Sequence, residues 1–282
     1  MYYSKTNDLS AILKKAQQKL NNAQITNAKK EIEWFLEYIF DLPFYDIRNN
    51  EKSQIKDIHL KQFNEFIDRR VSGEPFQYII NRSTFYGYDF IVNQHTLIPR
   101  PESEIIIDIV KKYDFFQDAL DIGTGSGNLA ITLSLEKAIN KIDAIDISSQ
   151  ALKIAMKNKQ RLKTNNVTFF HQNILNVLPI KSYDLIVSNP PYISQSEYQS
   201  LNKQIKDHEP QTSLTDNKDG LSFYTFFAKN LFKILKPKGK LILEIGLEKH
   251  KNMIQTIFIN NNYNYKWHKD LNGNYRVIEL YQ

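Results

Sequence analysis

The chain has 282 residues, of which 41% are hydrophobic and 24% charged, a composition typical of a soluble globular protein with one large domain or a main domain and a smaller partner. It has no cysteine, which excludes disulfides, thiolate metal sites and a cysteine nucleophile. No apolar run is long enough to span a membrane, and residues 1–20 do not resemble a secretory signal, so we expect a cytoplasmic protein. The formal net charge of +6 permits an acidic partner such as RNA without requiring one.

Residues 1–74 predict a small N-terminal helical bundle. Apolar residues recur at helical spacing in three stretches, residues 9–20, 32–39 and 55–71. Asp41, Leu42 and Pro43 end the second of these helices. We interpret Trp34 and the phenylalanines as core residues, find no catalytic constellation among them, and expect the bundle to serve substrate recognition.

Residues 75–102 predict a β-hairpin linker. Apolar and aromatic side chains alternate on both sides of Gly87, between Phe85 and Val92, which indicates two short strands. The linker ends in a segment where a proline on each side of Arg100 holds the backbone extended. It joins the bundle to a second domain, residues 103–282.

The second domain alternates strands and helices. Strands are expected at residues 119–122, 141–146, 167–170, 183–188 and 239–245, with helices between them, and at 263–267 and 275–281 as a C-terminal antiparallel hairpin. This pattern predicts an α/β fold with a seven-stranded, mostly parallel, Rossmann-like sheet covered by helices on both faces. In such a sheet, ligands bind outside the carboxyl ends of the strands, where the strand order switches.

A glycine-rich turn follows the first strand of this domain and contains Gly123, Thr124, Gly125, Ser126 and Gly127. Glycine at every second position lets the backbone turn sharply and approach a ligand. The Gly-x-Gly-x-Gly spacing differs from the dinucleotide fingerprint, and no Lys-Ser/Thr pair follows, which excludes a P-loop. The turn alone predicts either a structural turn or a nucleotide-binding site.

Asp146 ends the second strand, where a carboxylate can accept hydrogen bonds from both ribose hydroxyls of an adenosine. Its alternative role is that of an acid at a helix N-terminus, although Ser148 or Ser149 can cap that helix. The glycine turn and Asp146 together are still compatible with NAD.

Asn189, Pro190, Pro191 and Tyr192 come directly after the fourth strand. The prolines stiffen the backbone and remove N–H donors, so carbonyl oxygens are left to face a ligand. Such a ledge suits a planar –NH2 group, because Asn189 and a carbonyl can accept its protons while Tyr192 stacks on its face. Hydride transfer has no use for this arrangement, whereas methyl transfer to nitrogen does. An ordinary proline turn is the alternative.

These motifs resemble S-adenosylmethionine-dependent methyltransferases that act on an exocyclic or amide nitrogen. Over nearly the whole chain, further motifs are similar to the peptide-chain-release-factor glutamine methyltransferase family: Gly73 to Ile79, Leu97 to Glu104, Ser188 to Ile193, Glu209-Pro210, Asp219-Gly220-Leu221 and Leu243 to Gly246. The chain departs from the family's usual residues at Asn81, Ser103, Asn128 and Asn173. Asn173 stands where aspartate is usual, and it can act through its amide.

The resemblance implies methyl transfer to the side-chain amide nitrogen of the glutamine in the Gly-Gly-Gln motif of class 1 peptide chain release factors. It implies cofactor contacts from Gly123 to Gly127, Asp146, Asn173, Ile174 and Asn189, with Asn173 and Ile174 beside the adenine. Asn189, Pro190, Pro191 and Tyr192 would bind the substrate, and Asn189, Pro190 and Tyr192 would be catalytic. Because an amide nitrogen is a poor nucleophile, positioning does most of the work, with no dedicated base or metal.

The release factor is the expected partner of a monomer that needs no membrane and no direct contact with nucleic acid. An adenine-N6 methyltransferase acting on DNA or RNA is the first alternative, since it can use the same ledge once the base is flipped out. That reaction calls for a basic groove with stacking aromatic residues, which the mild charge does not indicate. A non-catalytic S-adenosylmethionine-binding or ribosome-assembly module is the second alternative.

Overall fold

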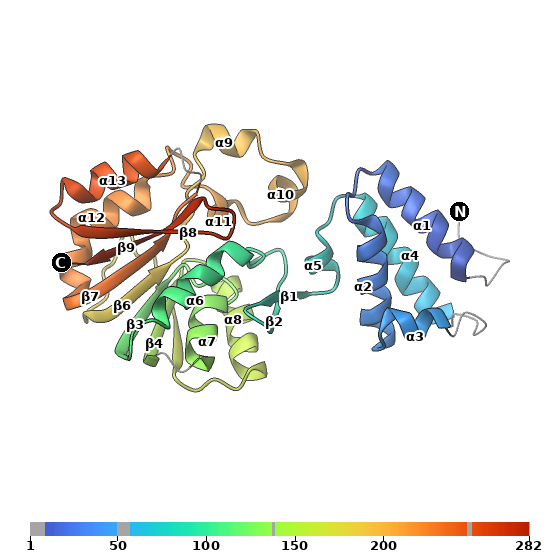
Figure 1. Cartoon of the computed structure of the whole chain (residues 1–282), viewed down its shortest axis with the longest axis horizontal. Helices are drawn as coiled ribbons and strands as arrows, with labels where there is room; N and C mark the ends of the chain where they lie inside the picture. The colour runs from blue at the N-terminus through green and yellow to red at the C-terminus, as the bar shows by residue number, and fades with distance from the viewer. Residues whose placement is uncertain (1–8, 50–56, 137–138, 247–249, 282) are drawn as a thin grey trace. The chain divides into compact units, whose positions relative to one another are not determined.

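The computed structural model describes residues 9–49, 57–136, 139–246 and 250–281, and the chain divides into two compact units, residues 1–81 and 82–282 (Figure 1). Each unit has its own hydrophobic core. Among the residues that the structure describes, no helix is both long and apolar enough to cross a membrane.

The first unit is helical. It contains α1 (Leu9–Asn22), α2 (Ala28–Phe40), α3 (Phe44–Asn49), α4 (Asp57–Val71) and α5 (Phe76–Ile79). The expected apolar faces of α1 and α2 form its core, where the rings of Phe35 and Phe66 stack with centroids 4.2 Å apart. Arg70 and Glu31 form a buried ion pair at 2.6 Å. The helix α2 ends just before Asp41, as the sequence predicts, and Asp41 takes the left-handed conformation.

Part of the sequence interpretation of this unit is wrong. The side chain of Trp34 is 47% exposed, so it is not a core residue. Ile58 and Val71, which the apolar spacing assigns to the inner face of α4, are also exposed, because that face is narrower than the pattern indicates. Ile55, expected on the same face, lies outside the described residues.

The second unit begins with a two-stranded antiparallel hairpin, β1 (Arg82–Phe85) and β2 (Tyr88–Ile91), which turns at Tyr86 and Gly87. Phe85 and Phe90 are fully buried in the core of this unit. The side-chain amide of Asn158 accepts a hydrogen bond from the Ile91 N–H at 2.7 Å and donates one to the Ile91 carbonyl at 3.0 Å. The hairpin is therefore fixed to the helix that carries Asn158.

A seven-stranded sheet forms the centre of the second unit, in the order β5-β4-β3-β6-β7-β9-β8. Its strands are β3 (Phe116–Ile122), β4 (Ile139–Asp146), β5 (Val167–His171), β6 (Tyr183–Ser188), β7 (Leu235–Glu244), β8 (Asn264–Lys269) and β9 (Tyr275–Tyr281). β3 to β7 are parallel, β9 pairs antiparallel with β7, and β8 pairs antiparallel with β9. The predicted fold class, including the antiparallel C-terminal hairpin, is confirmed.

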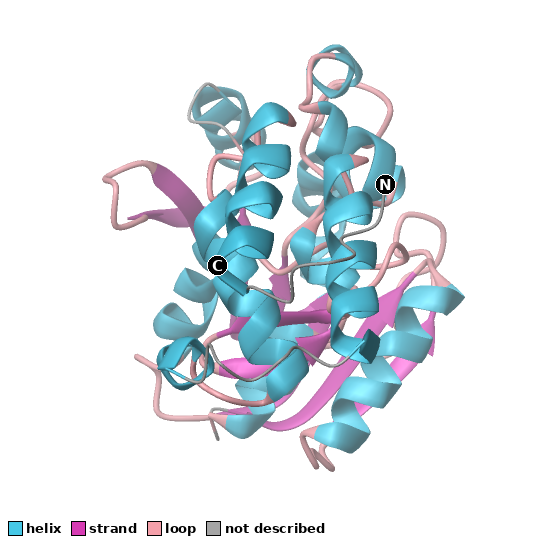
Figure 2. Ribbon diagram, turned by 90° about the vertical axis from the view of Figure 1, so that its right-hand side faces the viewer, coloured by secondary structure: helices cyan, strands magenta, loops and turns pink. Residues whose placement is uncertain are grey.

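Helices cover both faces of this sheet (Figures 1 and 2). One face carries α6 (Glu104–Val110), which follows the 3-10 turn η1 (Pro101–Ser103), together with α7 (Asn128–Leu135) and α8 (Ser149–Arg161). The other carries α12 (Ser222–Ile234) and α13 (Lys251–Ile259). Three short helices, α9 (Gln195–Gln199), α10 (Lys203–His208) and α11 (Gln211–Leu214), lie in the connection from β6 to α12.

The strand order switches at β3. The chain runs outward from β3 to β4 and β5, and then returns to place β6 on the opposite side of β3. The last residues of the two strands, Ile122 and Ser188, are paired in register, and the Ser188 hydroxyl donates to the Ile122 carbonyl at 2.7 Å. The segments that follow β3 and β6 therefore start side by side, at the position where open α/β sheets bind ligands.

Candidate functional site

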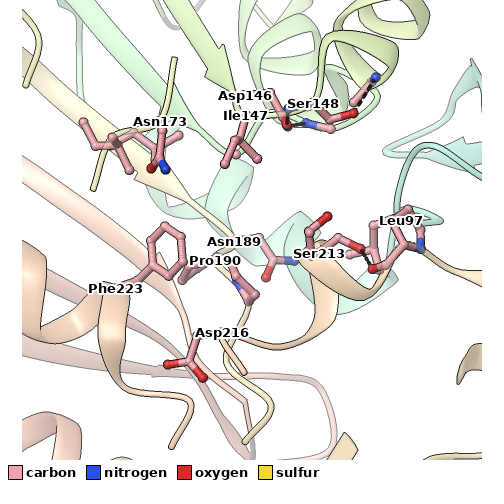
Figure 3. A pocket seen from close by; sticks show the side chains of 18 of the residues that line it. Leu97, Asp146, Ile147, Ser148, Asn173, Asn189, Pro190, Ser213, Asp216 and Phe223 are labelled. Atoms are coloured by element: carbon pink, nitrogen blue, oxygen red, sulfur yellow. Dashed lines mark hydrogen bonds between the residues drawn. The ribbon is translucent and has the colours of Figure 1, made fainter. Parts of the chain in front are cut away.

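A cavity of about 290 Å³ lies at the carboxyl ends of β3, β4 and β6 (Figure 3). The structure brings these predicted site residues together in its wall: Gly123, Gly125, Asp146, Asn173, Ile174, Asn189, Pro190 and Pro191. The other predicted site residues, Thr124, Ser126, Gly127 and Tyr192, are not part of the wall. Asn189 lies near the middle of the cavity, with Phe223 and Asn173 to one side and Ser213 and Leu97 to the other (Figure 3).

The glycine turn is held against β4. The N–H groups of Gly123 and Thr124 both donate to the carbonyl of Ile145, at 2.9 and 3.1 Å. Gly123 and Gly125 have φ angles of +74° and +56°, and a Cβ at either position would meet little or nothing within 4 Å. The turn therefore presents bare backbone to the cavity, which is what close approach of a ligand requires.

Gly127 has a different local role. It also has a positive φ of +82°, but a Cβ there would press against Ile131, Ala155 and Phe169. The side chains of Thr124 and Ser126 point to neighbouring polar groups, Thr124 donating to the buried Asp121 carboxylate at 2.7 Å. These residues shape the turn from behind, while Gly123 and Gly125 line the cavity.

Asp146 connects the end of β4 to the glycine turn. Its carboxylate oxygens accept hydrogen bonds from the N–H groups of Gly125 and Ser148, each at 2.8 Å. Burial raises the pKa of Asp146, against the opposing effect of those two N–H donors. The α8 N-cap is Ser148, whose hydroxyl accepts from the Ala151 N–H at 3.1 Å, so Asp146 is not needed as the cap. Asp146 lines the cavity, and its carboxylate oxygens have further lone pairs.

Asn173 lies at the far end of the cavity, after β5. Its side-chain oxygen accepts from the Leu175 N–H at 3.0 Å, and its NH2 group has no partner among the described residues. Ile147 and Phe223 lie around the same end of the cavity (Figure 3). Sequence reasoning missed both residues; Ile147 could have been found as the apolar neighbour of Asp146, whereas Phe223 belongs to α12 and comes close only in the fold.

Asn189 is anchored from behind by residues that sequence reasoning did not include in the site. Its side-chain NH2 donates to the Ser103 hydroxyl at 2.9 Å. The Ser103 hydroxyl in turn donates to the carboxylate of Glu244, the last residue of β7. Glu244 is fully buried, and burial raises its pKa to about 7 although Ser103 and the charge of Arg276 lower it.

Tyr192 lies behind the cavity wall. Its hydroxyl is 3.4 Å from a carboxylate oxygen of Glu244, and its ring packs so closely against Gly246 that a Cβ there would overlap it. A Cβ at Gly220 would likewise overlap the Tyr192 carbonyl. These contacts explain why glycine occupies both positions. The expected stacking of Tyr192 on a substrate amide stays a prediction.

The segment before η1 is tied to the connection that follows β6. Arg100 forms an ion pair with Glu209 at 2.5 Å, and the other Glu209 oxygen accepts from the Ile98 N–H at 3.2 Å. Glu209 is buried, and a buried charge needs partners. Arg100 and the Ile98 N–H supply them. This ion pair gives Arg100 a structural role, because it holds together two segments that line the cavity.

Two family models match the chain. The PrmC N-terminal domain matches residues 11–80, and the Methyltransferase small domain matches residues 101–210. Among solved structures, a methyltransferase from Pyrococcus furiosus superposes with a TM-score of 0.53 at 22% identity, covering 70% of this chain and 90% of that one. This likeness supports the methyltransferase fold of the sheet and its helices.

Curated relatives match over most of the chain. A bifunctional methyltransferase from Rickettsia felis is 33% identical over 96% of this chain, and the chain spans only 57% of the length of that relative. The release factor glutamine methyltransferase of Bacillus subtilis is 38% identical over 78% of this chain and 79% of its own length, and that of Bacillus cereus is 35% identical over 81% and 84%. On this similarity, with a matching N-terminal domain model and methyltransferase fold, the chain belongs to the release factor glutamine methyltransferase family.

Proposed function

We propose that this chain transfers a methyl group from S-adenosylmethionine to the side-chain amide nitrogen of a glutamine in a class 1 peptide chain release factor. The observation that carries the proposal is the place of Asn189, whose side chain lines the same cavity as the glycine turn and Asp146. The names of the Bacillus relatives support the release factor as the substrate. The Gly-Gly-Gln motif as the target sequence is part of the same proposal.

The residues of the cavity fit S-adenosylmethionine. Gly123 and Gly125 leave room for close approach, and Asp146 offers carboxylate lone pairs for ribose hydroxyls. At the far end, the free NH2 group of Asn173 and the apolar side chains of Ile147 and Phe223 suit a flat heterocycle such as adenine. When bound, the cofactor supplies an electrophilic methyl group on a sulfonium.

Asn189 and Pro190 act on the substrate by positioning it. The lone pair of an amide nitrogen is delocalised, so the rate depends on holding the nitrogen close and correctly oriented. The Asn189 side-chain oxygen and the Pro190 carbonyl would accept the two N–H protons and direct the nitrogen toward the methyl group. The partial negative charge of these two oxygens stabilises the positive charge that develops on the substrate nitrogen. The proton leaves to solvent after transfer, so no dedicated base is assigned.

The N-terminal unit is proposed to recognise the release factor. Its match to the PrmC N-terminal domain model covers residues 11–80 and supports a role specific to this family. Trp34 and Tyr45 are 47% and 73% exposed, so large aromatic side chains are available on its surface. Aromatic residues of this kind are enriched at protein interfaces.

Methyl transfer from labelled cofactor tests the proposed function. The chain is incubated with methyl-labelled S-adenosylmethionine and either a release factor, the same factor with the motif glutamine replaced by alanine, or single-stranded DNA and RNA. We expect label in the unaltered factor alone, located on the glutamine side chain by mass spectrometry. Label only in nucleic acid would contradict the release factor as the substrate and favour the adenine-N6 alternative. Label in both factors would contradict the glutamine as the target.

A further inference from the structure

A chain of hydrogen bonds runs from the cavity into the buried end of β7. The Asn189 NH2 group donates to the Ser103 hydroxyl at 2.9 Å, and that hydroxyl donates to one carboxylate oxygen of Glu244. The other carboxylate oxygen lies 3.4 Å from the Tyr192 hydroxyl. Ser103 and Glu244 are 1% and 2% exposed, so water does not replace these partners.

The direction of this chain is fixed by its buried end. A serine hydroxyl has one proton, and when it gives this proton to a carboxylate its oxygen can only accept from the next group. The group that Asn189 turns toward Ser103 must then be its NH2. The Asn189 side-chain oxygen makes no hydrogen bond within the described part of the chain and is left for the cavity, which Asn189 lines.

We propose that Ser103 and Glu244 are positioning residues that determine which end of the Asn189 amide meets the substrate, a role that rests on the proposed function. The substrate –NH2 group offers two donors, so it needs an acceptor opposite it. If the Asn189 amide were turned over, its own NH2 would face the substrate –NH2, and two donors would oppose each other. The hydrogen-bond chain therefore selects a donor-bearing nitrogen and excludes ligands that present only acceptors.

The direction of the chain depends on an ionised Glu244. A protonated Glu244 could donate to Ser103, and the Ser103 proton would then be free to point at Asn189. Around this carboxylate, Arg276 from β9 favours ionisation, whereas Glu102 from η1 opposes it. The Tyr192 hydroxyl approaches the carboxylate and the Tyr224 hydroxyl donates to the Glu244 backbone carbonyl at 2.9 Å. Since burial raises the Glu244 pKa to about 7, the rate should fall as the pH is lowered through that value.

Substitutions of Ser103 test the proposal. Ser103→Ala removes the acceptor for the Asn189 NH2, and we expect kcat on a release factor to fall about tenfold or more, while the dissociation constant for S-adenosylmethionine stays within about twofold. Ser103→Thr keeps the hydroxyl and should restore kcat to within about twofold of the unaltered protein. Ser103→Cys, nearly isosteric but a weak acceptor, should resemble Ser103→Ala and covers the case in which alanine destabilises the fold.

Ser134→Ala is the matched control, because it also removes a serine hydroxyl bound to an asparagine side chain, that of Asn166, away from the cavity. Its kcat should be unchanged, and its melting temperature shows the cost of such a loss to stability alone. An unchanged kcat in Ser103→Ala, or an equal loss in Ser103→Ala and Ser103→Thr, would overturn the positioning role. A pH profile whose acid limb near 7 persists in Glu244→Gln would overturn the part assigned to Glu244.

A measurement without turnover separates this inference from the proposed function. The side-chain NH2 signal of Asn189 in a 15N NMR spectrum is assigned by its loss in Asn189→Asp, and its hydrogen exchange is then followed. Exchange should be slow in the unaltered protein and in Ser103→Thr, and faster in Ser103→Ala. If the unaltered protein methylates no release factor, the proposed function fails while this exchange still reports the orientation. Equal exchange in all three proteins would overturn the inference.

Discussion

Ser188 donates its hydroxyl to the carbonyl oxygen of Ile122 at 2.7 Å and so connects the last residue of β6 to the last residue of β3. The residues that directly follow β6 and β3, Asn189 and Gly123, line the same cavity. Together with the backbone pairing of β3 and β6, this buried hydrogen bond aligns the segment proposed to hold the substrate with the segment proposed to hold the cofactor.

Loss of the hydrogen bond from Ser188 to Ile122 should lower the stability of the fold. In Ser188→Ala the buried Ile122 carbonyl loses a donor, so the free energy of unfolding should fall by about 1–2 kcal/mol. Ser182→Ala is the matched control, since its hydroxyl also bonds to a backbone carbonyl, that of Lys233, but at an exposed site. Urea unfolding followed by circular dichroism measures both. Equal losses in the two variants would contradict a special role for the Ser188 contact.

Asn189→Ala should impair turnover far more than cofactor binding. The alanine variant has no side-chain oxygen to accept a substrate N–H, and removal of one such oriented group typically costs about 100-fold in kcat. We expect the dissociation constant for S-adenosylmethionine, measured by isothermal titration calorimetry, to change by less than about fivefold. A variant that methylates the release factor at the unaltered rate would show that Asn189 does not position the substrate.

The glycines of the turn should separate into two classes. Gly127→Ala places a Cβ against Ile131, Ala155 and Phe169 at a positive φ, so strain and overlap together should lower the free energy of unfolding by about 2 kcal/mol or more. Gly125→Ala meets open space, so it should lose less stability but should weaken cofactor binding. Thermal unfolding and calorimetric titration of both variants make the comparison. The opposite ranking in stability would contradict the assignment of Gly127 to packing.

The pH dependence of stability should include a contribution from Glu279. Burial alone would raise its pKa, but hydrogen bonds from His268, Tyr113 and Lys240 outweigh this and lower it to about 2. Because this lies below the ordinary glutamate value of 4.5, the ionised group stabilises the fold above pH 4.5, and this stability is lost as the pH falls toward 2. The difference in unfolding free energy between the unaltered protein and Glu279→Gln should shrink over that interval. If this difference in unfolding free energy stayed constant between about pH 6 and about pH 3, the contribution of Glu279 would be refuted.

The aromatic surface of the N-terminal unit offers a test of recognition. Tyr45→Ala removes a side chain that is 73% exposed and so should leave the melting temperature nearly unchanged. If this surface contacts the release factor, KM for the whole factor should rise several-fold, about the loss of a single aromatic contact. KM for a short peptide containing Gly-Gly-Gln should stay the same. An equal rise in KM for both substrates would show that Tyr45 acts through the catalytic unit.

Local sequence patterns were sufficient for most of the fold. The strand expected at 183–188 is β6, and the two strands expected near the C-terminus pair as an antiparallel hairpin. Helical spacing also gave the inner residues of α1, of which Leu9, Ile12, Ala16 and Leu20 are buried as expected and Leu13 is partly buried. It failed for Trp34, because an aromatic residue on an amphipathic helix can lie at the border of its apolar face, and spacing alone does not locate that border.

The candidate site was only partly predictable. Motifs that are continuous in the chain, such as the glycine turn and the segment at Asn189, reach the cavity because each directly follows a parallel strand. Phe223 reaches the cavity from α12, and its approach depends on how that helix packs on the sheet. No local pattern in the chain distinguishes Phe223 from the other aromatic residues of the same helix.

The sequence by itself determined the order and type of the main strands and helices and the last residues of β3, β4, β6 and β9, because periodicity, glycine and proline act over a few neighbouring residues. Only the tertiary structure decided that Ser103 and Glu244 lie behind Asn189. Asn189 and Ser103 are 86 positions apart in the chain, and Ser103 and Glu244 are 141 positions apart. Such contacts depend on strand order and register, which bring the start of α6 and the end of β7 to the same edge of the sheet. The residue types offered at the cavity follow from the sequence, whereas the direction in which the Asn189 amide points follows from the fold.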